Sequence, residues 1–153
     1  MAKPTTYTAE TQGFTFTRKS HRTYTHAVLV QESKRADREA CERSARQSWH
    51  LNLSYHQACA AGRNPNAKRF PDQYPPARLE ADRVDAQAWL DKGEDGHVAA
   101  ALARHDARAA EVKTLDDGDT YFTCAGWCGR LDLAGKLAGS HVGSVIVEAV
   151  ATP

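Results

Sequence analysis

Leu, Ile, Val and Phe are scarce in this chain, and that scarcity limits the kind of core it can build. They account for 24 of the 153 residues, and only one of them is Ile. Fractions this low are typical of disordered chains when net charge is also high, but here the formal net charge is only +1. Twenty-six alanines and three tryptophans supply further burial, so we expect closely packed helices around a thin core.

The length fits one domain, and a thin core favours a homo-oligomer or a tightly bound partner. No apolar run approaches the roughly 18 residues of a membrane span. A polar, threonine-rich segment follows Lys3 and Pro4, so we expect no secretory signal. These features predict a cytoplasmic protein without cofactors or membrane contact. The cysteines are then expected to be free thiols; they are Cys41, Cys59, Cys124 and Cys128.

Three β-strands are predicted in residues 1–31, at 6–9, 13–19 and 23–31. Phenylalanines alternate with threonines in the second strand, as in a sheet with one solvated face. The third strand contains the apolar run Ala27-Val28-Leu29-Val30. We interpret the three strands as an antiparallel β-meander.

A long helix is predicted over 33–61, with Ser33 as its N-cap and Gly62 just beyond its end. A proline-rich connector follows over 63–78, and its length favours a functional role over a passive link. Residues 79–114 are predicted to form a helical hairpin whose two helices, broken at 93–96, pack against each other.

The last part of the chain, 119–151, is predicted to be a β-α-β unit. Its strands are placed at 120–125 and 144–151, with a short helix at 131–138 between them. The fold class that follows is a single α+β domain. One sheet would collect strands from both ends of the chain.

Charge is unevenly distributed along the sequence. Residues 1–78 carry 13 Lys and Arg against 6 Asp and Glu, and residues 79–153 carry 7 against 13. Such an asymmetry bears on partners and on self-association, not on chemistry. Positive and negative halves could meet within one molecule or between subunits.

The segment 18–26 is the strongest candidate for a partner-binding surface, because it gathers cations, histidines and an aromatic ring. We predict that Arg22, Tyr24 and His26 share one strand face. Such residues can neutralise phosphates and stack on bases; the alternative is a solubilising strand edge guarded by charge. The predicted partner-binding residues are Arg18, Lys19, His21, Arg22, Tyr24, His26, Lys68 and Arg69.

Two further patterns occur near the C-terminus. Cys124 and Cys128 have a spacing that zinc permits, and His56 with Cys59 could complete such a site. The alternatives are a disulfide or redox pair, or buried small hydrophobic residues. The turn over 126–130 could hold an anion before the short helix; its candidate residues are Gly126, Trp127, Gly129 and Arg130.

No catalytic motif accompanies these patterns: there is no nucleophile elbow, Walker loop or His-Glu-x-x-His sequence. We therefore predict a small non-enzymatic binding protein that docks on nucleic acid or on the acidic surface of a protein or nucleoprotein complex. Alanine- and arginine-rich usage suggests a phage or bacterial gene, with inhibition of host defence as one role. The alternatives are a self-assembling structural protein and a small hydrolase or transferase built on the 126–130 turn.

Overall fold

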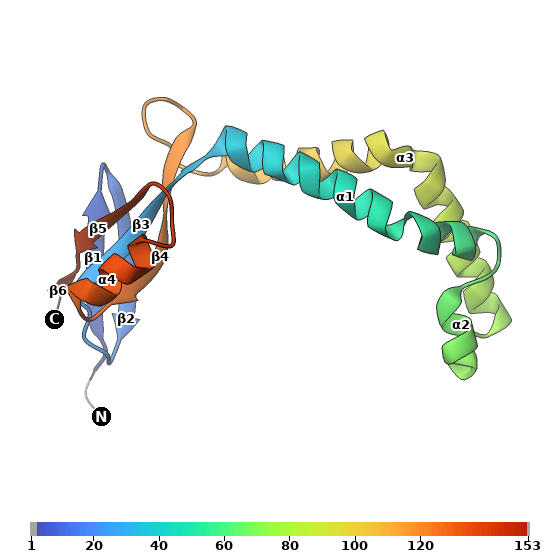
Figure 1. Cartoon of the computed structure of the whole chain (residues 1–153), viewed down its shortest axis with the longest axis horizontal. Coiled ribbons are helices and arrows are strands. Elements are labelled where there is room, and N and C mark those ends of the chain that lie inside the picture. The colour runs from blue at the N-terminus through green and yellow to red at the C-terminus, as the bar shows by residue number, and fades with distance from the viewer. Residues whose placement is uncertain (1–2, 153) are drawn as a thin grey trace. The chain divides into compact units, whose positions relative to one another are not determined.

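The computed structural model describes residues 3–152, and its contacts divide the chain into two compact units (Figure 1). Unit 1 combines the two ends of the chain, Met1–Asp37 and Val112–Pro153, and unit 2 is the segment Arg38–Glu111. Helices and strands are both present, so the predicted α+β class is confirmed. That the chain is a single domain stays a prediction, because compact units do not show how many parts unfold cooperatively.

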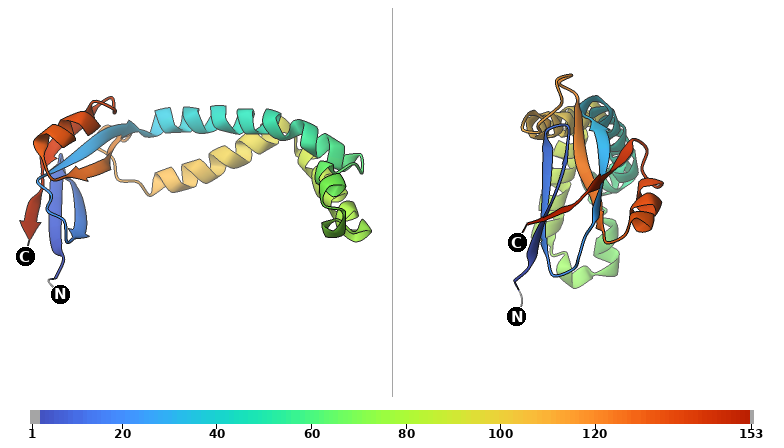
Figure 2. Two further views of the ribbon diagram at one scale, coloured as in Figure 1. Left: turned by 60° about the horizontal axis from the view of Figure 1, so that its bottom comes forward. Right: turned by 90° about the vertical axis from the view of Figure 1, so that its left-hand side faces the viewer.

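Unit 1 contains two three-stranded antiparallel sheets (Figure 2). Sheet A has the order β2-β1-β6, and sheet B has the order β4-β3-β5. Gln12 and Gly13 form the two-residue turn between β1 and β2; both have positive φ, as a type I′ hairpin turn requires. The strands are β1 Thr5–Thr11, β2 Phe14–Ser20, β3 His26–Ser33, β4 Thr120–Cys128, β5 Ser144–Glu148 and β6 Val150–Thr152.

The predicted N-terminal meander is wrong, as is the single sheet, because β3 does not pair with β2. Instead β3 lies in the centre of sheet B, between β4 and β5. Ala27, Val28 and Leu29 are each 0% exposed, so this strand is apolar on both faces and needs cover on both. The threonine-rich β2 suits an edge position in a separate sheet.

Helix α4, Leu131–Ala138, makes the predicted β-α-β connection. It joins β4 to β5, which are both antiparallel to β3 and therefore parallel to each other with β3 between them. A Cβ on Gly126 would lie 2.7 Å from Leu137 Cδ2, so glycine allows α4 to pack closely on β4. The other face of sheet B packs against sheet A through Ala9, Phe14, Ala27, Leu29 and Phe122.

The start of α1, Lys34–Ala60, is capped by the adjacent Ser33 and by Asp119, which is distant in sequence. Ser33 is the N-cap, as predicted, because its Oγ accepts the Ala36 N–H at 3.2 Å. Asp119 accepts the Arg35 N–H at 2.8 Å and the Ser33 hydroxyl at 2.6 Å. These hydrogen bonds and the nearby Arg35 charge lower the pKa of Asp119.

Unit 2 consists of the rest of α1 with α2 Pro65–Arg69, the 3-10 helix η1 Pro71–Gln73 and α3 Pro76–Ala110. The predicted long helix is therefore confirmed, whereas much of the proline-rich connector is helical. Gly93 interrupts α3 with a left-handed φ of 71°.

The helical hairpin is formed differently from the prediction, because the two halves of α3 do not pair with each other. Trp89, before the break, stacks on Trp49 of α1. After the break, α3 runs back beside the first part of α1, where Asp106 pairs with Arg38 at 3.1 Å (Figure 2). One left-handed residue bends a helix without reversing it, so α1 is the partner of both halves.

Replacing Asp119 with alanine is expected to lower the thermal midpoint at pH 7, because the first turn of α1 loses a cap. The folded-state pKa of Asp119 is depressed below its ordinary value of 3.8. Its stabilising effect is therefore present above that pH and is lost as the pH falls further. Circular-dichroism melts of both proteins between pH 2.5 and 7 should converge at the acidic end.

The control for this test is Asp116→Ala, which removes a carboxylate from the same exposed turn without removing a cap. Equal loss of stability in the two variants at pH 7 would contradict the role given to Asp119.

Candidate functional site

The predicted basic surface lies in unit 1, and we define it as Arg18, Lys19, His21, Arg22, Tyr24 and His26. The first two residues lie near the end of β2, and the next three lie in the segment that links β2 to β3. Because β3 begins only at His26, the two-residue strand period does not extend to Arg22 and Tyr24. The prediction that Arg22, Tyr24 and His26 share one strand face is therefore wrong.

Tyr24 is the centre of an aromatic cluster within this surface. Its ring meets that of Tyr7 edge-on, with centroids 5.3 Å apart, and that of Trp127 at 6.2 Å. The Arg18 guanidinium carbon lies 5.2 Å from the centroid of the Tyr24 ring, within cation–π range. Arg18 of β2 is also the cross-strand partner of Tyr7 of β1, so the pairing of these two strands places Arg18 beside this cluster.

The cations of the basic surface are available to a partner. Arg18, Lys19 and Arg22 are exposed, and none of them forms an ion pair with a carboxylate within residues 3–152. Other arginines are neutralised locally: Arg130, for example, forms a two-pronged contact with Asp132 at 2.6 and 2.9 Å. The basic surface therefore presents unbalanced positive charge.

The charge asymmetry along the sequence does not persist in three dimensions. Unit 1 contains nine basic and eight acidic residues, and unit 2 contains eleven of each. Each unit is assembled from both the basic and the acidic half of the chain. Any electrostatic recognition must therefore depend on local clusters and not on oppositely charged halves.

Lys68 and Arg69 lie in unit 2, near the end of α2. Both side chains are exposed, and the Arg69 guanidinium carbon lies 5.3 Å from the centroid of the Phe70 ring. They belong to a different unit from the basic surface, and their predicted part in a shared partner contact stays a prediction.

The segment 126–130 is not the glycine turn that the sequence suggests. Gly126 and Trp127 lie within β4, where they pair with Val28 and Ala27, and only Gly129 and Arg130 form the bend before α4. Asp132 already engages Arg130. Trp127 packs against the core, and Gly126 allows the close approach of α4. An anion-binding role for these residues stays a prediction.

All four cysteines are free thiols. Cys124 packs beside the core of unit 1, where burial raises the pKa of its thiol; a hydrogen bond with the backbone of Gly126 and the charge of Arg18 oppose this rise. Its predicted zinc partners, His56 and Cys59, belong to unit 2. Within residues 3–152, no three His, Cys, Asp or Glu side chains are grouped so that they could hold a metal ion.

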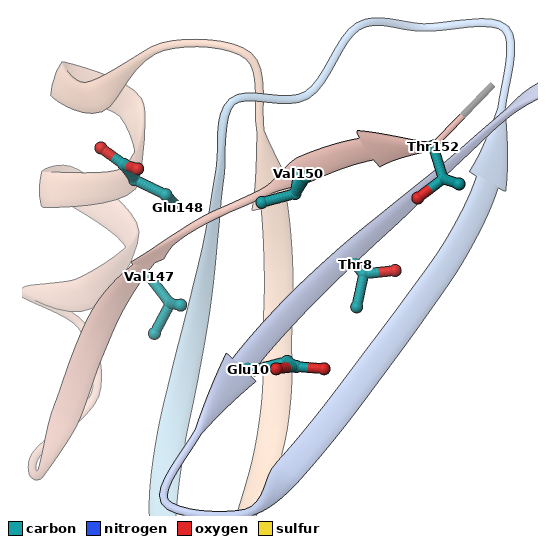
Figure 3. Close-up of a pocket in the computed structure, with 6 residues that line it drawn as sticks. All are labelled: Thr8, Glu10, Val147, Glu148, Val150 and Thr152. Atoms are coloured by element: carbon teal, nitrogen blue, oxygen red, sulfur yellow. The ribbon is translucent and has the colours of Figure 1, made fainter.

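A groove of about 450 Å³ lies in unit 1, where β1 diverges from the continuous path of β5 and β6 (Figure 3). Its lining consists of Thr8, Glu10, Val147, Glu148, Val150 and Thr152. These side chains offer hydroxyl and carboxylate oxygens and methyl groups, but neither a nucleophilic thiol nor an imidazole. Trp127 and Arg130, on which a hydrolase or transferase would be built, do not line it.

Unit 2 contains an aromatic stack that sequence patterns did not single out. The Trp89 ring lies between Trp49 at 3.8 Å and His56 at 3.9 Å, and both pairs are nearly parallel. Nδ1 of His56 is buried without a hydrogen-bond partner. Desolvation, with a smaller effect from the His97 charge, lowers the pKa of His56. The helical spacing of Trp49 and His56 on α1 was the available signal, but their partner, Trp89, belongs to another helix and lies far away in sequence.

Comparisons with protein-family models, with curated protein sequences and with solved structures found no match to this chain. Within residues 3–152, no helix combines the length and the apolar character that crossing a bilayer requires.

Replacing His56 with phenylalanine is expected to make the stability of the protein less sensitive to mild acid. The folded-state pKa of His56 lies below its ordinary value of 6.5, so the unfolded state binds the proton more readily. Stability should consequently decline as the pH falls below about 6.5 in the native protein, and decline less in the variant. Thermal midpoints measured between pH 5 and 7.5 give the comparison.

The control is His141→Phe, at an exposed position in unit 1. If both variants retain the native pH profile, the stacked imidazole is not a source of acid sensitivity.

Proposed function

We propose that the chain is a non-enzymatic binding protein and that the basic surface of unit 1 contacts the phosphates of nucleic acid. The observation that carries this proposal is the cluster of exposed cations, Arg18, Lys19 and Arg22, without ion-pair partners within residues 3–152. Lys and Arg neutralise phosphates and release the counterions condensed around them, which favours binding entropically.

The aromatic neighbours of these cations favour nucleic acid over an acidic protein surface. Arg18 is held over Tyr24, and guanidinium planes as well as aromatic rings stack on unpaired bases. Trp127 and Tyr7 support the Tyr24 ring from two other directions.

The small number of cations predicts a modest dependence of affinity on salt. Three phosphate contacts correspond to a slope of log K against log salt of about −2 for single strands and about −3 for duplex DNA. Replacing Arg18, Lys19 and Arg22 together with alanine should remove most of that slope and weaken binding at least about tenfold at 50 mM salt. Fluorescence anisotropy with a labelled 20-nucleotide strand and a 20-base-pair duplex measures both quantities.

A matched control removes three exposed cations from unit 2 and changes the net charge by the same amount: Lys92, Arg104 and Arg108, each to alanine. This variant should bind like the native protein. Equal losses in the two triple variants, or no binding of either probe, would contradict the proposal. Binding of polyglutamate but of neither nucleic acid would indicate an acidic protein partner instead.

The predicted phage or host-defence role stays an expectation from amino-acid usage, and no residue of the basic surface carries it. Cytoplasmic location is likewise an expectation.

Self-assembly is a second candidate, and a different observation favours it. In sheet B, β5 pairs with β3 along one edge only, and its Ile146 is 39% exposed. An apolar edge strand is a template for pairing with another chain, and the one charged residue of β5, Glu148, lies at its end. Oppositely charged halves do not favour self-assembly, because each unit is nearly neutral.

If β5 pairs between copies, sedimentation equilibrium should detect a dimer at micromolar concentration, and Ile146→Lys should shift it to monomer. Val142→Lys, at a 98% exposed position outside the strand, is the control and should leave the dimer intact. A native protein that sediments as a monomer would remove this candidate.

A further inference from the structure

A second groove lies entirely within unit 2, at the turn that follows α1. It is lined by the segment 62–65, by Ala67 and Lys68 of α2, and by Leu79 of α3. Its volume is about 500 Å³, within the range of about 300–1,000 Å³ that small-molecule sites occupy. Neither the basic surface nor the groove of unit 1 contributes to it.

A buried amide holds this groove in shape. Asn64 is only 5% exposed; its Nδ2 donates to Asp82 at 2.8 Å, and its Oδ1 accepts the Asn66 N–H at 2.9 Å. The turn is thereby tied to α3 on one side and to the start of α2 on the other. Because the nitrogen and the oxygen of the Asn64 side-chain amide are both engaged, we assign this residue the role of positioning the walls and not of contacting a ligand.

The walls combine apolar surface with the positive charges of Arg63 and Lys68. Pro65, Ala67 and Leu79 supply the apolar part. Arg63 and Lys68 are exposed, and neither forms an ion pair within the part of the chain that the structure describes. The complementary ligand has an apolar body and at least one negative charge.

We propose that this groove binds a small amphipathic anion, with an apolar body of one to three rings or a short aliphatic chain and a carboxylate or sulfonate. The apolar body lies against Pro65, Ala67 and Leu79, and the anion lies between Arg63 and Lys68. The proposal is independent of nucleic-acid binding by unit 1, because it involves none of the same residues.

The direct test uses 8-anilinonaphthalene-1-sulfonate, whose fluorescence rises in apolar surroundings, and its uncharged counterpart N-phenyl-1-naphthylamine. The full chain should bind the sulfonate saturably at one site. Replacing Arg63 and Lys68 together with glutamine should weaken sulfonate binding at least tenfold and leave binding of the uncharged probe unchanged. Octanoate should displace the sulfonate, whereas octanol should not.

Two further variants separate this site from general effects of charge and folding. Arg69→Gln removes a neighbouring cation of α2 that does not line the groove, and it should bind the sulfonate like the native protein. Ala67→Leu fills the groove and should weaken both probes while circular dichroism stays native.

Several results would overturn the proposal. They are multiple weak sulfonate sites, an unchanged affinity in the Arg63/Lys68 variant, or equal losses in that variant and in Arg69→Gln. Displacement of the sulfonate by a glutamate- and leucine-rich peptide but not by octanoate would indicate a protein ligand and would also overturn it.

Discussion

Burial of one strand on both of its faces organises unit 1. β3 carries four consecutive apolar residues, and Ala27, Val28 and Leu29 are removed completely from solvent. Its two edges pair with β4 and β5, one face receives α4, and the other face packs on sheet A. A chain with few large aliphatic residues gains most from placing them where every side is covered, since the hydrophobic free energy scales with the apolar area buried.

The path of the chain also decides where charge accumulates. Both units draw on the basic first half and on the acidic second half of the sequence, so each is nearly neutral. Some of the exposed cations that form no ion pair in the described residues lie together in small clusters. The basic surface of unit 1 and the rim of the groove in unit 2 are two such clusters, and they suit different ligands. The first lies beside aromatic rings at a sheet edge, and the second surrounds an apolar hollow.

The candidate sites differ in whether the sequence alone could predict them. Arg18, Lys19, Arg22 and Tyr24 lie within seven residues of one another, so local composition alone was enough to single them out. The groove of unit 2 joins the connector to Leu79, and the aromatic stack joins His56 to Trp89. Sequence reasoning missed both, because no local pattern reports which residues of two distant helices meet.

The sequence by itself determined the α+β class, the long helix with Ser33 as its cap, and the short helix before the last strands, because periodicity and capping act over a few residues. Only the tertiary structure decided that β3 leaves the N-terminal hairpin, that α1 is the partner of both halves of α3, and that the opposing charges mix within each unit. The physical reason is that strand pairing and helix packing join residues far apart in sequence. Local propensities allow several such pairings, and the chain adopts the one that buries the most apolar surface.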